Sequence, residues 1–357
     1  MDKNRLDNLD IIKAFAIMGV VSLHVGLWQI DFINGTGLNF IQYALRQLSE
    51  GVPVFVAVNG FLLFRKKSFD LKKHRKKMKK LFFILVIWSM ILTVSGYCLS
   101  SPTEPISGRI IYDYFIGTRL NSTYTGVLWF IQNLLAVYLI FPALWYLYKE
   151  HIEIFNYIFI IMVFFVCGIA VLYQIRDIGQ AITSSEWDVV TKAINYLELF
   201  NPIANGWYLV FFCLGGIIVE YLEILELHRK ILLGAALLAW PIVVLFGYLT
   251  SIFQGAVYGE ALFYNSPLML IFLTGLIVVS MPYKSKGTVI ERLLASIGRN
   301  TFGIYLSHFL FIFICNLFWV KVDMVGRAER YLLVFICAYI FSIVVKRIPV
   351  LKYIIEL

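Results

Sequence analysis

Three ionisable residues lie at helical spacing in the first apolar segment of the chain. Asp10, Lys13 and His24 are separated by three and eleven residues, and both intervals return to nearly the same face of an α-helix. Asp10 is then placed to pair with Lys13, and His24 lies about 16 Å farther along the axis. Ionisable groups inside a membrane span are costly and are therefore candidates for function. A neutral imidazole there is a suitable general base.

Spacing alone leaves a second interpretation of these residues open. Lys13 can extend its ammonium group to the lipid headgroups. His24 can hydrogen-bond a neighbouring helix without taking part in any reaction.

A second histidine, His308, lies in a later apolar segment together with Tyr305 and Ser307. If both segments cross the membrane in the same direction, His308 and His24 lie at similar depths and could share a cavity. The alternative is a structural histidine that bonds a backbone carbonyl group. The other three histidines are expected at the solvated surface: His74, His151 and His228.

Side-chain amides occur in two further apolar segments. Asn59 lies near the end of one, and Gln132 and Asn133 follow Trp129 in the other. Amides within a membrane commonly hydrogen-bond one helix to the next. Lining a substrate cavity is the alternative role.

The elements that position these residues are predicted from composition and hydropathy. Of the 357 residues, 60% are hydrophobic and 15% charged, which excludes an ordinary water-soluble domain and a disordered chain. Runs of roughly 20 apolar residues can cross a bilayer as helices. The sequence therefore predicts an all-α integral membrane protein with about ten transmembrane helices, near residues 10–29, 51–64, 80–99, 126–148, 152–174, 205–222, 231–249, 264–282, 301–320 and 331–348.

The formal net charge of +9 equals the excess in one short segment. Residues 65–80 hold ten Lys and Arg residues against a single acidic residue, Asp70. With ten spans and a cytoplasmic N-terminus, the inner segments hold 22 of the 31 basic residues and the outer segments eight. Basic residues concentrate on the cytoplasmic side, so we expect both termini there. The basic loop then faces anionic lipid, and no nucleic-acid partner is expected.

Two features of the connecting segments complete the prediction. The longest outer segments, 100–125 and 175–204, could form short helices or a lid. The five cysteines lack C-x-x-C spacing, so we expect neither a metal site nor a disulfide framework.

Several segments, taken in order, resemble the acyltransferase 3 family of membrane enzymes, which acylate sugars, typically in bacterial surface polysaccharides. The first is LDNLDIIKAFAIMGVVSLH, in which Lys13 and His24 fit the family's Arg/Lys-x10-His pattern. GVPVFVAVNGFLLFRKK resembles a Val-Pro-x-Phe segment that leads into Ser-Gly-Phe and a basic loop. VLWFIQNLLAVYLIFP and TFGIYLSH are similar to a Trp-Phe helix ending in proline and to a late Tyr-x-x-His helix.

The chain departs from the family pattern at two positions. Asn59 stands where the family often has serine, and Lys13 keeps the charge of arginine without its bidentate geometry. The resemblance covers nearly the whole chain, so we expect one transmembrane domain over residues 1–357 and no appended soluble domain.

The resemblance implies a membrane O-acyltransferase of the cell membrane. It would move an acyl group, acetyl being the simplest, from cytoplasmic acyl-CoA to a hydroxyl group of a cell-surface or lipid-linked glycan. His24 would be the general base, Lys13 would orient the donor, and Asp10 would hold Lys13. Contacts to the coenzyme A phosphates would come from Arg65, Lys66 and Lys67. The residues expected to line the substrate cavity are Asn59, Trp129, Gln132, Asn133, Tyr305 and His308.

A carrier that exports or flips a glycan or small polar molecule is the alternative, with the histidines relaying protons. Embedded ionisable groups on ten helices suit such a carrier equally well. The sequence leaves open the acceptor, the acyl group, a covalent intermediate and the oligomeric state, and a homo-oligomer is compatible with it.

Overall fold

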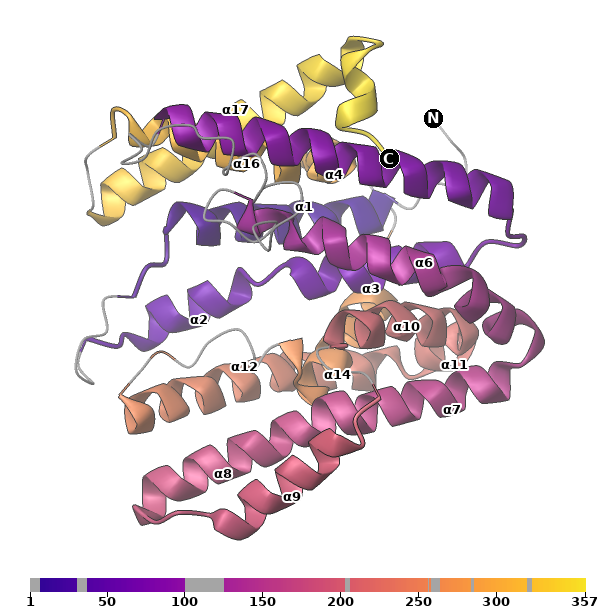
Figure 1. The fold of residues 1–357 in the computed structure, drawn as a ribbon, viewed down its shortest axis with the longest axis vertical. Coiled ribbons are helices and arrows are strands. Elements are labelled where there is room, and N and C mark those ends of the chain that lie inside the picture. Colours follow the sequence, from indigo (N-terminus) through magenta and orange to yellow (C-terminus); the bar gives the residue numbers. More distant parts are fainter. Residues whose placement is uncertain are drawn as a thin grey trace, which may run out of the picture. The chain divides into compact units, whose positions relative to one another are not determined.

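The computed structural model describes residues 7–30, 37–99, 125–202, 206–255, 257, 264–283, 286–319 and 323–357. Every regular element in these ranges is a helix (Figure 1). The all-α class predicted from the sequence is therefore confirmed for the part of the chain that is described.

Within the described ranges, seven helical stretches are long and apolar enough to cross a membrane. An eighth is present if α15 (Val289–Arg299) and α16 (Thr301–Asn316), which meet at an angle of 76°, form one broken span. The seven are α1 (Asp7–Val25), Phe40–Phe64 with α2 (Phe40–Leu48) and α3 (Val52–Phe64), α4 (Leu71–Leu99), Gly126–Glu150 with α6 (Trp129–Glu150), Ile152–Gln180 with α7 (Ile152–Val163) and α8 (Ile169–Thr183), α12 (Arg229–Gln254) and α17 (Met324–Arg347).

Each of the ten predicted apolar runs overlaps a helix, but the number of spans stays a prediction. Two of the runs form shorter apolar helices, α10 (Trp207–Glu220) and α14 (Pro267–Ser280). With 14 residues each, they rise about 21 Å. A hydrocarbon core measures about 30 Å.

The chain divides into two compact units. The first comprises residues 1–9, 28–68 and 143–286, and the second residues 10–27, 69–142 and 287–357. The candidate residues on α1 and α16 belong to the second unit, whereas α3 (Val52–Phe64) and the basic residues directly after it belong to the first.

Close helix packing in the first unit depends on glycines. A Cβ atom at Gly60 of α3 would collide with the carbonyl oxygen of Phe212 on α10, and one at Gly215 would collide with the backbone of α3. Small residues let two helix backbones approach in this way inside a membrane. They hold the helix that carries Asn59 against α10.

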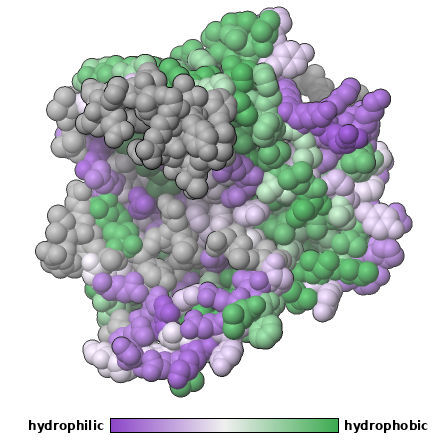
Figure 2. Space-filling model, in the orientation of Figure 1, coloured by the Kyte–Doolittle hydropathy of each residue, from purple (hydrophilic) through white to green (hydrophobic). Residues whose placement is uncertain are grey.

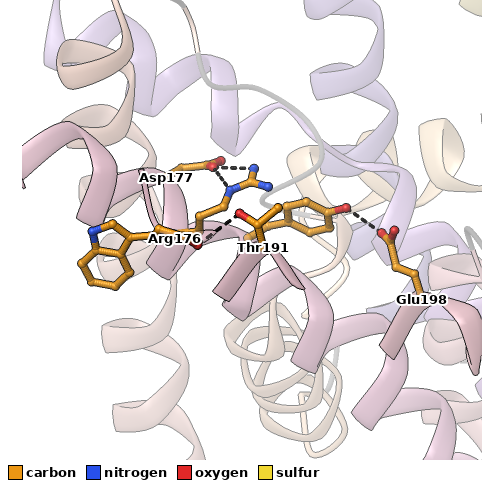
Figure 3. Close-up of polar contacts among 6 residues, drawn as sticks. Arg176, Asp177, Thr191 and Glu198 are labelled. Atoms are coloured by element: carbon orange, nitrogen blue, oxygen red, sulfur yellow. Dashed lines mark hydrogen bonds and ion pairs between the residues drawn. The ribbon is translucent and has the colours of Figure 1, made fainter. Parts of the chain in front are cut away.

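A helical hairpin of the first unit, formed by α8 and α9, covers most of the predicted outer segment 175–204. Helix α7 (Ile152–Val163) continues through a π-helical turn (Phe164–Gly168) into α8 (Ile169–Thr183), and α9 (Asp188–Leu199) contacts α8. Arg176 pairs with Asp177, and the Tyr173 hydroxyl donates to Glu198 at 2.6 Å (Figure 3). The expected short helix is therefore present. Of the other segment, 100–125, all but the last residue lies outside the described residues.

In the second unit, α16 packs against α4 and α17. At Gly303 of α16 a Cβ atom would collide with the side chain of Ser342 on α17. The bend before α16 is formed at Asn300, whose side-chain amide donates to the carbonyl oxygen of Ser296 at 2.8 Å. The bend gives α16 a direction that α15 does not share.

The basic segment, which was expected to be a loop, is largely helical, so that part of the prediction is wrong. Only residues 65–70 connect α3 to α4, and the lysines from Lys72 to Lys80 form the first turns of α4. Asp70 accepts a hydrogen bond from the backbone N–H of Lys73 at 3.0 Å. That bond lowers the pKa of Asp70, and the carboxylate caps a helix end where cations alone would be unfavourable.

Large apolar side chains are exposed on the surface of the protein, as the green areas of Figure 2 show. On α4 alone, Phe82, Phe83 and Val94 each expose more than half of their surface. Water-soluble proteins rarely present broad apolar patches. Lipid contact explains them.

Candidate functional site

The two embedded histidines meet in the second unit. The Nδ1 of His24 on α1 and the Nε2 of His308 on α16 lie 2.9 Å apart. Their ring centroids are 5.0 Å apart and their planes differ by 23°. With the nitrogens so close, this centroid separation means that the rings meet edge to edge in a hydrogen bond rather than face to face.

The two rings differ in exposure. His308 is completely buried, whereas His24 is exposed. The edge of the Phe309 ring closes one side of the pair, with centroids 5.1 Å from each imidazole. Of the two side chains, only that of His24 reaches the surface of the protein.

A hydrogen-bonded chain continues from His308 along α16. The Nδ1 of His308 lies 2.6 Å from the carbonyl oxygen of Tyr305. The structural role that the sequence left open for His308 was a bond to a backbone carbonyl group. This role applies to its Nδ1. Its Nε2 bonds His24 instead.

Tyr305 links this helix to the segment before α6 (Trp129–Glu150). Its hydroxyl group donates to the carbonyl oxygen of Val127, and its ring meets Phe130 edge to face with centroids 5.4 Å apart. The start of α6 is thereby held beside α16. The polar residues predicted there, Trp129, Gln132 and Asn133, are half-buried.

Asp10 and Lys13 form the ion pair that their spacing predicts. Their side chains meet at 2.6 Å, with Asp10 4% exposed and Lys13 20% exposed. Next to them, a Cβ atom at Gly298 of α15 would collide with the carbonyl oxygen of Asp10. The pair therefore lies beside the final turn of α15, close to the bend.

Four of the predicted site residues lie in the first unit. Asn59 is half-buried on α3 beside Gly60, and Arg65, Lys66 and Lys67 are exposed where α3 ends. Their roles in donor and acceptor binding stay predictions, as do the roles of the residues in the second unit.

One expectation about the remaining histidines is wrong. His74 was expected at the solvated surface, but it is buried on α4 and its Nε2 lies 2.7 Å from the carbonyl oxygen of Tyr138. The rings of Phe69, Tyr138 and Phe141 surround it. The basic neighbours of His74 suggested a solvated position, and two of the three aromatic residues that bury it, Tyr138 and Phe141, lie at least 64 positions farther along the chain.

Comparison with known proteins decides the family. The model of a family described as an acyltransferase domain matches residues 6–347. The chain belongs to the acyltransferase 3 family. It is 22% identical over 340 residues to a Bacillus subtilis (strain 168) protein with a provisional name, membrane-bound acyltransferase YfiQ, covering 93% of this chain and 88% of the relative. No solved structure matches the chain.

Family membership and the apolar helices together make this chain a multi-pass membrane acyltransferase. The structure shows where the two residues that fit the Arg/Lys-x10-His pattern, Lys13 and His24, lie on α1. Lys13 is paired with Asp10 near one end of α1, and His24 is bonded to His308 near the other.

Proposed function

We propose that this acyltransferase moves an acetyl group from cytoplasmic acetyl-CoA to a hydroxyl group of a cell-surface or lipid-linked glycan, with His24 as the general base. The observation that carries the proposal is the His24–His308 hydrogen bond, which leaves His24 exposed and oriented. Histidine is the side chain best suited to exchange a proton near neutral pH.

In the proposed reaction, His24 alone carries the proton from the acceptor hydroxyl group to the coenzyme A thiolate. The Nε2 of His24 takes the proton of the acceptor hydroxyl group as its oxygen attacks the thioester carbonyl carbon. The new carbon–oxygen bond forms, the carbon–sulfur bond breaks, and the coenzyme A thiolate receives the proton from His24. Direct transfer needs no further reactant.

The charged residues suit the donor. Coenzyme A carries phosphate groups, and Lys13 provides a cation near the other end of the helix that carries His24. The exposed Arg65, Lys66 and Lys67 provide further donors for phosphate oxygens. Which of these cations contacts the donor is part of the proposal.

The test uses membrane vesicles that contain the protein and lipid-linked glycans from the producing cells. Acetyl-labelled acetyl-CoA is added, and label is counted in the glycan fraction. We expect incorporation with the wild-type protein and a loss of at least about 100-fold with His24→Asn, because general-base catalysis contributes roughly 10²–10⁴-fold.

The matched control is His228→Gln, which changes an exposed histidine whose Nδ1 bonds the carbonyl oxygen of Ile224 in its own helical segment. It should retain full incorporation. If His24→Asn transfers label as well as the control, His24 is not the base. Movement of glycan across the vesicle without any labelled product would instead favour the exporter.

A further inference from the structure

We infer that His308 acts as a positioning residue that fixes the tautomer of His24, so that Nε2 of His24 is the basic nitrogen. This inference rests on the proposed function and assigns a role within the same site. Two hydrogen bonds and the chemistry of a backbone carbonyl group carry it.

The backbone partner of His308 determines which of its ring nitrogens carries a proton. A carbonyl oxygen can only accept a hydrogen bond, so the Nδ1 of His308, 2.6 Å from the Tyr305 oxygen, must carry a proton. The opposite tautomer would place two lone pairs against each other in a fully buried position. In neutral His308, the Nε2 therefore has no proton and accepts.

The tautomer of His308 determines the tautomer of His24. Its Nδ1 faces the accepting Nε2 of His308 at 2.9 Å, so that Nδ1 must donate. In a neutral imidazole only one nitrogen carries a proton, and the Nε2 of His24 is left as the acceptor. Hydrogen positions follow here from the hydrogen-bond network.

The two ring nitrogens of His24 have different surroundings. No residue in the described part of the chain hydrogen-bonds the Nε2 of His24, and the side chain is exposed. The basic nitrogen thus belongs to the exposed member of the pair and is the one not bonded to a described residue. The partner that orients the base is a neutral ring, so it supplies orientation without the negative charge that a carboxylate would add.

The inference is tested first by solid-state NMR on the reconstituted protein. His24 is the histidine followed by valine, and His308 the one followed by phenylalanine, so labelling these residue pairs isolates each ring. Near neutral pH, we expect His24 protonated at Nδ1 and bare at Nε2. A neutral His24 protonated at Nε2 would overturn the inference, whether or not the protein transfers acyl groups.

Two variants of His308 separate positioning from folding. His308→Gln supplies an amide oxygen that can accept from Nδ1 of His24, whereas His308→Leu fills a similar space without an acceptor. We expect His308→Leu to lose the His24 Nδ1–H signal and to lower kcat about tenfold or more, with the donor KM unchanged. His308→Gln should keep the signal and most of kcat.

Equal losses in both His308 variants would contradict the positioning role, because only the leucine removes the acceptor. His228→Gln again serves as the control and should leave the His24 spectrum and the rate unchanged. If the spectra agree with the inference but no variant or wild type transfers label, the proposed function fails while the tautomer assignment stands.

Discussion

At the scale of single residues, the ion pair of Asp10 with Lys13 has both a structural and a catalytic aspect. Asp10 is almost completely buried, and Lys13 is its partner at 2.6 Å. Removing one member of a buried pair leaves a charge in a poorly solvated place, which is costly. A loss of activity in a single variant would therefore not separate donor binding from stability.

A double variant separates these two effects. We expect Lys13→Ala to lower the free energy of unfolding by about 1–3 kcal/mol, between the values for exposed and buried pairs. Asp10→Asn combined with Lys13→Gln should restore most of that stability but not the affinity for acetyl-CoA. Thermal unfolding and the donor KM are the two measurements. An unchanged donor KM in the double variant would remove Lys13 from the donor site.

The sequence predicted the residue pairs only in part. The spacing of Asp10 and Lys13 within one helix was sufficient to predict their ion pair, because both positions share a face. The contact of His24 with His308 joins residues 284 positions apart, and only matching depth suggested it. The tautomer required the atomic positions of both rings.

At the scale of elements, the bend between α15 and α16 determines which residues face α1. Gly298, two residues before the bend at Asn300, touches the backbone of Asp10. The apolar run 301–320 predicted the helix but not the 76° change of direction before it. A local sequence pattern does not contain the packing against α1 and α17 that accompanies the bend.

Substitution of Gly298 should separate these helices. We expect Gly298→Val to lower the free energy of unfolding by about 1–3 kcal/mol or more, because the added carbons meet backbone rather than a flexible side chain. Acyl transfer should fall as well. Thermal unfolding of the purified protein in detergent measures the first effect.

Gly234 provides the matched control for this prediction. It lies in α12 and is exposed, and a Cβ atom added there would meet nothing within 4 Å. Gly234→Val should therefore change neither stability nor transfer measurably. Equal effects at the two positions would mean that the contact of Gly298 with α1 does not matter.

At the scale of the whole molecule, hydropathy predicted the positions of the helices better than the number of helices that cross the membrane. Every predicted run overlaps a helix, but α10 and α14 are short. A bilayer can thin around a short apolar helix, so the lengths of α10 and α14 are compatible with a crossing.

Accessibility of introduced cysteines decides the crossing of α12 and the side of its two ends. In a cysteine-free background, Val257→Cys should react with an impermeant thiol reagent applied to intact cells. Leu227→Cys, at a position 84% exposed, should react only after permeabilisation. These outcomes follow from ten spans with a cytoplasmic N-terminus. Labelling of both positions from outside would contradict that topology.

The basic start of α4 has a consequence for motion. The helix has 29 residues and is about 43 Å long, so it exceeds the hydrocarbon core by about 13 Å. Sliding by one turn from the basic end toward the bilayer centre would carry Lys79 and Lys80 toward lipid at up to about 3 kcal/mol each. Sliding by one turn in the opposite direction would bring Phe82 and Phe83 into water. Because both displacements are unfavourable, α4 resists piston-like motion. Helix α16 packs against α4, so α4 sets the depth at which His308 lies.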